Sequence, residues 1–331
     1  MKNELPRRRV LQFAGLAVGA SAVPTTARGA TAWTRRDTPT AQKLWDVSYA
    51  FDGAYAVGDE GCVLERDGDW RVVTDDGPSG NGENLYGSGA TDDGRRLWVV
   101  GNSGALGEYD ATTGEFLGSG SRDFSEPEDY TGNFTDIVAT GDAGDANLYV
   151  TDDSGYVHYS FDNGESWAYT TPGSGSTIPA ISFHDDRDGH CADTNQSVFD
   201  TDDGENWVKI GVENRDENFY GVDSNGENNV WVAGGRGLVL FYDGSWSAAD
   251  LGDVRLRDIR VSTDTTDGLT VGFGGRAFRR SGGTWVEEES STDENLEGVV
   301  RGDPDAFDFQ PTVSETPDIA VGAGGTIIEH Q

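Results

Sequence analysis

The feature that most constrains this chain is a repeat that returns seven times between residues 44 and 296. Each copy opens on a short, largely apolar segment, and the copies begin at Leu44, Leu85, Phe134, Ile178, Phe219, Leu256 and Leu296. Successive starts lie 37 to 49 residues apart. A period near forty, with several short strands per unit, is typical of four-stranded β-propeller blades. The sequence therefore predicts an all-β fold, a seven-bladed β-propeller.

The copies also share an internal order of strands. An Asp/Gly-rich turn follows the first strand, a short apolar second strand is clear in six copies, and a third strand comes next. The fourth strand opens on an aromatic residue, at Trp70, Phe116, Trp167, Trp207, Trp246 and Trp285. The seventh copy stops one strand short, but residues 31–39 around Trp33 resemble residues 165–172 around Trp167. We therefore expect the N-terminal strand to complete the last blade, which removes an exposed sheet edge.

The first 32 residues resemble an export signal. Arg7, Arg8 and Arg9 form a twin-arginine core, an apolar run covers residues 11–23, and small-residue cleavage sequences occur at 20–22 and 30–32. The motif implies export of an already folded protein. The apolar run is too short for a comfortable membrane span, so we expect no transmembrane anchor. The expected division is a signal segment over 1–32 and a propeller over 33–331, secreted or held at the cell surface.

The formal net charge is −35, from 59 acidic and 24 basic residues, and only three of the basic residues are lysines. Such an imbalance destabilises a compact fold in dilute buffer and keeps it soluble where salt screens the charges. We interpret it as the surface of a halophile protein. The regular strand pattern argues against a disordered acidic chain. The acidity also argues against nucleic-acid binding, which needs a positive face.

Two segments match a turn motif of the form S-x-D-x-G-x-x-W, the Asp-box. The first is complete and the second lacks only the serine, and the motif residues are Ser160, Asp162, Gly164, Trp167, Asp202, Gly204 and Trp207. Asp can accept backbone N–H groups in a tight turn and Gly can take the left-handed conformation, so we interpret these motifs as structural turns. With the rest of the blade sequence they resemble bacterial neuraminidase-repeat propellers and the photosystem II assembly-factor type of propeller. Unrelated functions share such repeats.

For sialidases the resemblance implies three arginines that hold a carboxylate, a Tyr nucleophile with a Glu partner, and an Asp acid. We do not find this set in register. The inner-strand arginines are confined to the sixth and seventh copies, at Arg255, Arg257, Arg260 and Arg301, whereas those enzymes draw theirs from separate blades. We therefore expect no catalytic residues, and an exported glycoside hydrolase or lyase remains an alternative.

Residues 184–193 hold two His, one Cys and four Asp. The spacing permits Zn or Cu, and part of the segment resembles a Ca loop. Other copies carry Asp/Gly turns without His at this place, so we interpret the segment as a surface turn and expect no metal or cofactor. A cation-dependent adhesion module is a further alternative. Cys62 and Cys191 fall in nearly opposite copies, too far apart for a disulfide, and are expected as buried thiols.

The innermost strands of a propeller line its channel, and the loops that enter them form the mouth, where ligands most often bind. The second residues of the first strands supply the candidate ligand site, Trp45, Tyr86, Tyr220, Arg257 and Glu297. The third residues supply the candidate channel, Asp46, Asp136 and Asp258. The leading hypothesis is a monomeric, non-catalytic scaffold that binds a protein or polysaccharide of the cell envelope. The alternative is that the second residues only pack beneath the loops.

Overall fold

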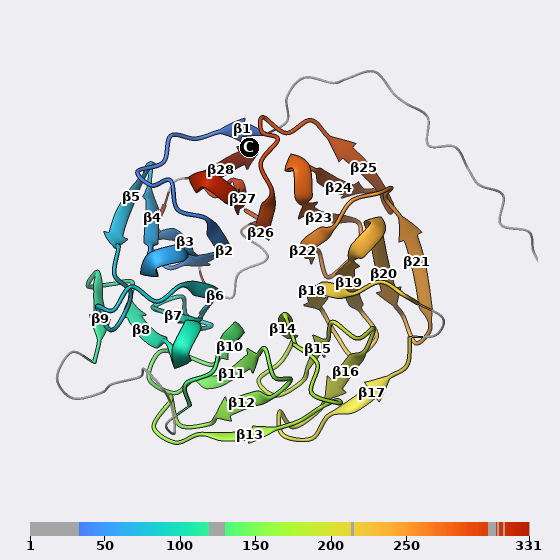
Figure 1. The fold of residues 1–331 in the computed structure, drawn as a ribbon, viewed down its shortest axis with the longest axis horizontal. Helices are drawn as coiled ribbons and strands as arrows, with labels where there is room; N and C mark the ends of the chain where they lie inside the picture. The colour runs from blue at the N-terminus through green and yellow to red at the C-terminus, as the bar shows by residue number, and fades with distance from the viewer. Residues whose placement is uncertain are drawn as a thin grey trace, which may run out of the picture.

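The chain forms a closed ring of seven four-stranded antiparallel sheets, with the first strand of each repeat nearest the centre of the ring (Figure 1). The computed structural model describes residues 33–118, 130–212, 215–303, 309, 311–313 and 315–330. The predicted all-β, seven-bladed propeller is therefore confirmed. The expected signal segment and most of the loop at 119–131 lie outside the described residues. No helix among the described residues has the length and apolar character needed to cross a membrane.

Each blade runs from an inner strand at the channel to an outer strand at the rim. Blades one and two contain β2 (Leu44–Ala50), β3 (Gly53–Gly58), β4 (Val63–Asp67) and β5 (Asp69–Thr74), then β6 (Leu85–Ala90), β7 (Arg96–Gly101), β8 (Leu106–Asp110) and β9 (Glu115–Leu117). Blades three and four contain β10 (Phe134–Thr140), β11 (Asn147–Asp152), β12 (Val157–Ser160) and β13 (Ala168–Thr170), then β14 (Ala180–Phe183), β15 (Gly189–Ala192), β16 (Val198–Thr201) and β17 (Val208–Ile210). Blades five and six contain β18 (Phe219–Ser224), β19 (Val230–Gly234), β20 (Leu238–Tyr242) and β21 (Trp246–Asp250), then β22 (Leu256–Val261), β23 (Asp267–Gly272), β24 (Ala277–Ser281) and β25 (Thr284–Glu288). Blade seven contains β26 (Leu296–Val300), β27 (Asp318–Gly322), β28 (Thr326–His330) and β1 (Thr34–Arg35).

The hydrophobic core consists of seven clusters, each between two neighbouring blades. The aromatic residue at the head of each outer strand packs toward the preceding blade. Trp70 of blade one joins the cluster shared with blade seven, and Trp285 of blade six joins the cluster shared with blade five. Trp33 occupies the same place between blades six and seven. This shared position explains why the sequence repeats an aromatic residue there.

The N-terminal strand closes the ring, as expected. Thr34 pairs with Glu329 and Arg35 with Ile328, so β1 is the outer strand of blade seven. The Trp33 side chain is fully buried, and its Nε1 donates a hydrogen bond of 2.9 Å to Glu288 of blade six. Blade seven is thus built from both ends of the propeller, and no blade is left with three strands.

A buried carboxylate joins blade seven to blade one. Glu329 is 2% exposed and accepts hydrogen bonds from Arg66 Nε and Trp70 Nε1 at 2.8 and 3.0 Å. The Arg36 guanidinium, just after β1, reaches the second Glu329 oxygen at 2.8 Å. Because two arginines and an indole share one carboxylate, the charge of Glu329 is compensated although it is out of water.

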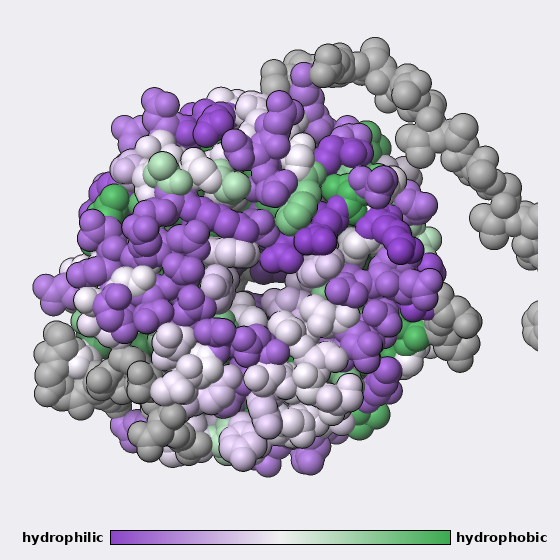
Figure 2. All heavy atoms as spheres, viewed as in Figure 1, coloured by the Kyte–Doolittle hydropathy of each residue, from purple (hydrophilic) through white to green (hydrophobic). Residues whose placement is uncertain are grey.

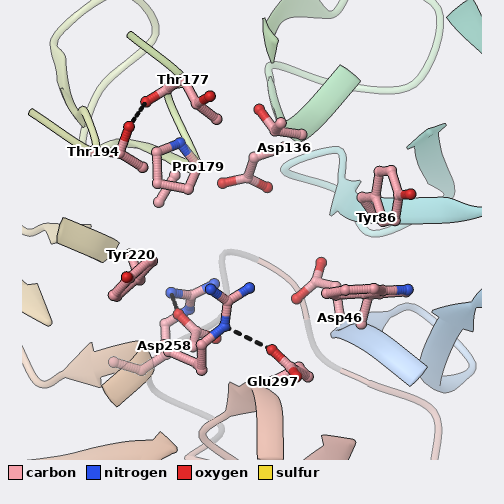
Figure 3. A pocket seen from close by; sticks show the side chains of 14 residues that line it. Asp46, Tyr86, Asp136, Thr177, Pro179, Thr194, Tyr220, Asp258 and Glu297 are labelled. Atoms are coloured by element: carbon pink, nitrogen blue, oxygen red, sulfur yellow. Dashed lines mark hydrogen bonds and ion pairs between the residues drawn. The ribbon is translucent and has the colours of Figure 1, made fainter. Parts of the chain in front are cut away.

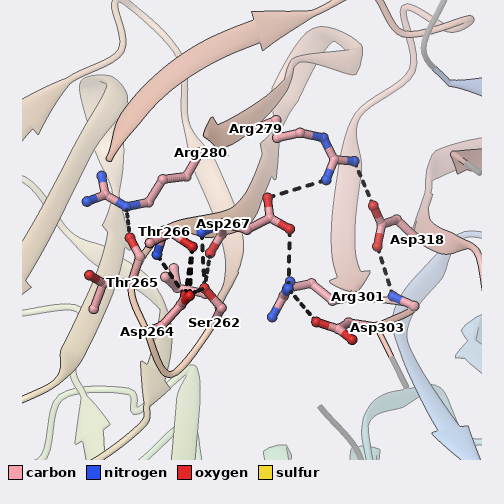
Figure 4. A network of polar contacts seen from close by, with 12 residues as sticks. Ser262, Asp264, Thr265, Thr266, Asp267, Arg279, Arg280, Arg301, Asp303 and Asp318 are labelled. Carbon is pink, nitrogen blue, oxygen red and sulfur yellow. Dashed lines mark hydrogen bonds and ion pairs between the residues drawn. The ribbon is translucent and has the colours of Figure 1, made fainter. Parts of the chain in front are cut away.

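Blades six and seven share a second polar network at the base of the ring (Figure 4). Asp267 lies between Arg279 and Arg301, at 3.6 and 3.3 Å from their terminal nitrogens. Arg279 also contacts Asp318 at 2.6 Å, and the Gly302 N–H donates to the other Asp318 oxygen. These contacts hold the two ends of a long connection between β26 and β27, an insertion over residues 302–317.

That insertion connects β26 to β27, at the end of the ring opposite the strand starts that form the mouth. Its described residues reach blade one, where the Thr312 N–H donates to the Phe51 carbonyl at 2.8 Å and Tyr49 donates to the Pro317 carbonyl at 2.6 Å. Blades one and seven are therefore connected by this insertion as well as by the contacts of Glu329.

Most of the described Asp and Glu residues are at least partly exposed. The face drawn in Figure 2 is largely hydrophilic around a central hollow. Cys62 and Cys191 are both buried and unpaired, as expected.

Candidate functional site

A β-bulge at the start of the inner strand forms the mouth. In six blades the pairing register shifts at the second residue, for example between Leu44 and Asp46 and between Leu256 and Asp258. A bulged residue is left out of the ladder, which re-aims its side chain. Blade four has Pro179 at this point, and proline has no N–H to give to a ladder. The second residue of each repeat is thereby directed to the mouth.

The bulged residues surround a cavity of about 290 Å³ at the centre of the ring (Figure 3). All five predicted ligand-site residues line it, and so do all three predicted channel residues: Trp45, Tyr86, Tyr220, Arg257, Glu297, Asp46, Asp136 and Asp258. The structure therefore brings together residues that lie up to 252 positions apart, from 45 to 297.

Trp45 is held on several sides. Its Nε1 donates to Asp59 at 2.7 Å, and Tyr86 meets it in a T-shaped contact with 5.1 Å between ring centroids. Asp59 belongs to the short 3-10 turn η1 (Asp59–Gly61) after β3. The Lys43 ammonium lies 3.2 Å from the centroid of the Trp45 ring, a cation–π contact. One face of this indole is therefore already covered by a cation.

Tyr220 makes cation–π contacts with two arginines. The Arg257 and Arg255 guanidinium carbons lie 5.1 and 5.4 Å from its ring centroid. Arg257 also donates to Glu297 at 2.6 Å, and Lys43 contacts the other Glu297 oxygen at 2.7 Å. Arg255 is exposed and contacts no carboxylate in the part of the chain that the structure describes. Lys43 and Arg257 thus share the Glu297 carboxylate at the mouth of an acidic protein, and Arg255 lies beside Tyr220 without a counter-charge among the described residues.

Sequence reasoning predicted the aromatic column but not this use of it. We expected the rings to offer stacking area to a ligand. Instead, Trp45 and Tyr220 hold cations in place, and two of these, Lys43 and Arg255, precede the bulged residues. The signal was present in the sequence, because a basic residue stands just before the first strand of copies one and six, Leu44 and Leu256.

The opposite wall of the cavity has a different chemistry. Thr135 of blade three lines the cavity here, together with Thr177 and Pro179 at the start of blade four. The Thr135 and Thr177 hydroxyls donate to the carbonyls of Ile178 and Asp153, at 2.5 and 2.9 Å. Because these hydroxyls are already engaged, the wall offers mainly methyl groups and a proline ring. The mouth is cationic on one side and weakly apolar on the other.

Below the mouth, three aspartates brace neighbouring blades. Asp46 accepts the Ser88 N–H of blade two at 2.8 Å, and Asp258 accepts the Val299 N–H of blade seven at 2.9 Å. Asp136 bonds to Ile181 of blade four in the same way, at 3.0 Å. The three aspartates that were predicted to line the channel therefore also connect each inner strand to the next one.

The channel carboxylates surround one cation, Arg260. Its Nη1 contacts Asp258 at 2.6 Å. Burial opposes the charge on Arg260, but Asp258, Asp223, Asp46 and Asp136 outweigh burial and raise its pKa. Burial also raises the pKa of Asp46 to about 6, with Asp258 adding to the rise. Burial and then Asp46 raise the pKa of Asp136 to about 8. The channel thus holds four aspartates around one arginine, whereas three cations lie at the mouth above it.

Among the described residues that line the cavity, each carboxylate already has a hydrogen-bond or ion-pair partner. Arg257 and Glu297 bind each other, and the three channel aspartates each accept backbone N–H groups. None of the four histidines lines the cavity. General acid–base catalysis needs a group that can reach a substrate proton. The arrangement is suited to holding a ligand by charge.

The two Asp-box segments form tight turns, built in two ways. In the first, Ser166 N–H donates to Asp162 at 2.9 Å, Gly164 has φ +78°, and half-buried Trp167 packs toward blade two. In the second, the accepting carboxylate is Asp203, which takes the Glu205 and Asn206 N–H groups at 2.8 and 2.7 Å. These bonds, first those to Asn206, lower the pKa of Asp203 to about 2.

This second turn corrects the alignment of the motif. Asp202 is exposed, and the hydroxyl of Thr201, two residues before Asp203, takes the place of the Ser160 hydroxyl. Gly204 keeps the left-handed conformation at φ +76°, and Trp207 packs at the interface of blades three and four. The second turn is therefore one residue shorter than the first, from Thr201 to Trp207 instead of from Ser160 to Trp167. Aligning the two motifs on their tryptophans alone placed Asp202, and not Asp203, at the Asp position.

Residues 184–193 form a turn followed by β15, the second strand that the sequence pattern did not show in this copy. The Asp186 carbonyl accepts from Thr140 and Tyr149 of blade three at 2.8 and 2.9 Å. His190 and His184 both contact the Ser224 hydroxyl, at 2.8 and 3.0 Å. The described residues contain no group of three or more His, Cys, Asp or Glu placed to hold a metal ion.

No protein-family model matches the chain. No curated protein matches it either. Solved propellers do, at low identity. The structure described as YCF48 bound to D1 peptide aligns with a TM-score of 0.67 and 13% identity, over 92% of this chain and 98% of that chain. The WD40 propeller domain of Doa1 aligns with a TM-score of 0.68 and 12% identity, over 91% and 96%.

A catalytically inactive virginiamycin B lyase from Staphylococcus aureus, solved with quinupristin, aligns with a TM-score of 0.69 and 11% identity, over 90% of this chain and 98% of that chain. One of these neighbours is thus described with a peptide and another is an inactive lyase with a small molecule. At such identities the likeness shows the seven-bladed β-propeller fold alone.

Proposed function

We propose that this chain is a non-catalytic propeller that binds an extended, acidic segment of a partner protein at its mouth. The observation that carries the proposal is the set of cations fixed over aromatic rings around the central cavity, at Lys43, Arg255 and Arg257. In a protein with a net charge of −35, two cations that share one carboxylate and a third that contacts none among the described residues form a site for an incoming carboxylate.

The shape and charge of the cavity support a chain segment over a glycan. A sugar ring stacks on a free aromatic face, but Lys43 covers one face of Trp45 and two arginines lie beside Tyr220. The wall of Thr135 and Pro179 suits an apolar side chain next to the acidic one. The one arginine deeper in the channel, Arg260, is already bound by Asp258, so the cations available to a carboxylate lie at the mouth. A neighbour with the same fold is described with a bound peptide.

The proposal includes export to the outside of a halophile cell. It is supported by the twin-arginine sequence at Arg7–Arg9 and by the excess of acidic residues. The partner is then another protein of the cell envelope.

A titration with labelled peptides tests the binding. The probe is a fluorescein-labelled peptide of alternating glutamate and phenylalanine, compared with the glutamine version and with a neutral oligosaccharide. We expect binding of the acidic peptide only. Arg257→Ala should weaken it about tenfold to a hundredfold, because a hydrogen bond between charged groups contributes about 1.5–3 kcal/mol.

Arg236→Ala is the matched control. Arg236 is an exposed arginine of the short turn after β19 and does not line the cavity. Its substitution removes the same charge as Arg257→Ala does. We expect it to leave the dissociation constant within about twofold. Equal weakening by both variants would mean that only the general field of the protein matters. Preferential binding of the oligosaccharide, or turnover of it, would contradict the proposal.

A further inference from the structure

The residue just before each of the seven repeats has the same backbone role. Its carbonyl accepts an N–H from the turn that follows the second strand of its own blade, for example Lys43 from Asp59 and Arg255 from Phe273, at 2.9 and 3.0 Å. Blades one and six carry Lys43 and Arg255 at this position. Four other blades carry asparagine there, at Asn84, Asn133, Asn218 and Asn295. The backbone role is therefore constant, and the side chain is what differs.

The asparagine side chains connect neighbouring blades. Asn84 Oδ1 of blade two accepts the Glu60 N–H of blade one at 2.9 Å. Asn295 Oδ1 of blade seven accepts the Gly274 N–H of blade six at 3.0 Å. Both donors are the middle residues of short turns, Glu60 in η1 and Gly274 in η5 (Phe273–Gly275). Asparagine at this position can thus link a blade to the one before it.

Lys43 and Arg255 cannot make this bond, because an ammonium or guanidinium group has no hydrogen-bond acceptor. Their side chains lie against aromatic rings instead, Lys43 against Trp45 and Arg255 against Tyr220. Departures from a local structural pattern are expected at functional sites. The two blades that lack this link are the two that bring these cations to the mouth.

The Arg255 guanidinium is oriented by two rings and is open to a ligand. Its central carbon lies 4.8 Å from the centroid of the Phe273 ring and 5.4 Å from that of Tyr220. Lys43 and Arg257 both contact Glu297, whereas Arg255 contacts no carboxylate among the described residues. A cation that is oriented before the ligand arrives loses less conformational entropy on binding. Arg255 therefore differs from the other two cations of the mouth.

We propose that Arg255 is a second carboxylate subsite, and that the bound segment carries two acidic residues separated by one residue. The inference rests on the proposed function, in which Lys43 and Arg257 take the first carboxylate. The guanidinium carbons of Arg255 and Arg257 lie 5.4 and 5.1 Å from the Tyr220 centroid, so they are at most about 10.5 Å apart, the sum of these distances. In an extended segment the side chains at i and i+2 lie on one face, about 7 Å apart, whereas those at i and i+1 point to opposite faces.

Calorimetric titrations with three unlabelled heptapeptides test this spacing at one KCl concentration. All have blocked ends, so that no terminal carboxylate competes. The first has two glutamates separated by one phenylalanine, the second has the same composition with the glutamates adjacent, and the third has glutamine in place of one glutamate. We expect the first to bind at least about tenfold more tightly than the other two, a factor within the range of one hydrogen bond between charged groups.

Arg255→Asn removes the subsite and gives blade six the residue that four other blades carry there, so we expect the melting temperature to stay the same or rise. The variant should bind the first peptide only as tightly as the third, and its affinity for the third should stay within about twofold of the wild type. Arg236→Asn is the matched control, because Arg236 is an exposed cation of the turn η4 (Gly235–Gly237). It should leave all three dissociation constants within about twofold.

The outcomes separate this inference from the proposed function. Equal binding of the first two peptides overturns the spacing. An Arg255→Asn protein that still prefers two acids, or that loses affinity for the third peptide as much as for the first, overturns the second subsite. These results leave the proposed function in place as long as Arg257→Ala weakens the acidic peptides. Binding of no peptide, or binding that Arg257→Ala does not affect, overturns the proposed function and this inference with it.

Discussion

At the residue scale, one bulged position per blade determines what the mouth presents. The bulge leaves the second residue of the inner strand out of the ladder, and the third residue, in the channel, must then fit against the next blade. Three blades have Gly at that third position and three have Asp. A Cβ on Gly87, Gly221 or Gly298 would lie 2.7 to 2.9 Å from the backbone of the following aspartate. Small and acidic residues therefore alternate for packing reasons.

Gly87→Ala tests this packing. Its added methyl would meet the Asp136 Cα at 2.7 Å, so blades two and three must move apart. We expect a loss of about 1–3 kcal/mol in the free energy of unfolding, measured by chemical denaturation. Gly211→Ala is the control, because nothing lies within 4 Å of its added Cβ. A Gly87→Ala protein as stable as Gly211→Ala would contradict the close approach of the inner strands.

The Glu329 carboxylate gives a second residue-scale prediction. Glu329→Gln keeps the shape of the side chain but leaves Arg66, with 7% of its side chain exposed, without its counter-charge. We expect a loss of about 3–5 kcal/mol, since breaking a buried ion pair leaves an uncompensated charge. Glu287→Gln removes an exposed pair with Arg276 and should change stability by less than about 1 kcal/mol. Equal effects in the two denaturation curves would exclude Glu329 as a link between the blades.

At the element scale, the ring depends on a two-residue strand. Deleting residues 31–39 removes β1 and the buried Trp33, which exposes the edge of β28 and opens the cluster between blades six and seven. The loss should exceed the roughly 3–5 kcal/mol typical of removing one large buried aromatic side chain. Deleting residues 23–30 serves as the control and should leave the melting temperature unchanged. An equally small effect of both deletions would show that blade seven closes without β1.

The element scale also shows where sequence patterns succeed and fail. The blade count and the closing strand were predictable because each blade buries the same aromatic position against its neighbour, and Trp33 completes that set. Strand β15 was not predictable, because its G-H-C-A sequence lacks the apolar pattern. Its His190 is buried, with one hydrogen bond between its ring and the Ser224 hydroxyl. The cations of the mouth were also missed. Basic residues stand just before Leu44 and Leu256, but residue types alone do not show that these side chains contact the rings of Trp45 and Tyr220.

At the scale of the whole molecule, the net charge of −35 opposes the compact ring. Its exposed carboxylates repel one another over a distance set by salt, about 10 Å at 0.1 M and about 3 Å at 1 M. The free energy of unfolding should therefore rise as KCl increases to molar concentrations, and the gain should level off once screening is complete. Circular dichroism melts in dilute buffer and in molar KCl measure this. Equal stability in both would mean that the acidic surface is not an adaptation to salt.

In high salt the repulsion between exposed charges is screened, whereas buried charges are screened much less. The pH dependence of stability then reports mainly the aspartates of the channel. The pKa of Asp46 is raised to about 6 and that of Asp136 to about 8, whereas an unfolded chain titrates both near 4. Between these values the folded protein binds more protons than the unfolded one. The free energy of unfolding must therefore fall as pH rises from about 5 to 8, by up to about 1.4 kcal/mol per pH unit for each group.

Denaturation in molar KCl at pH 5, 6, 7 and 8 measures that slope. Asp136→Asn cannot ionise, so its slope should be shallower than that of the wild type whatever its absolute stability. Asp264→Asn is the control, because hydrogen bonds, first that from Ser262, lower the pKa of Asp264 to about 2, below the window. His184 acts in the opposite sense, since burial and His190 lower its pKa, but both variants retain it. An Asp136→Asn protein with the wild-type slope would show that Asp136 is ionised in the folded ring, with Arg260 and the backbone donors outweighing its burial.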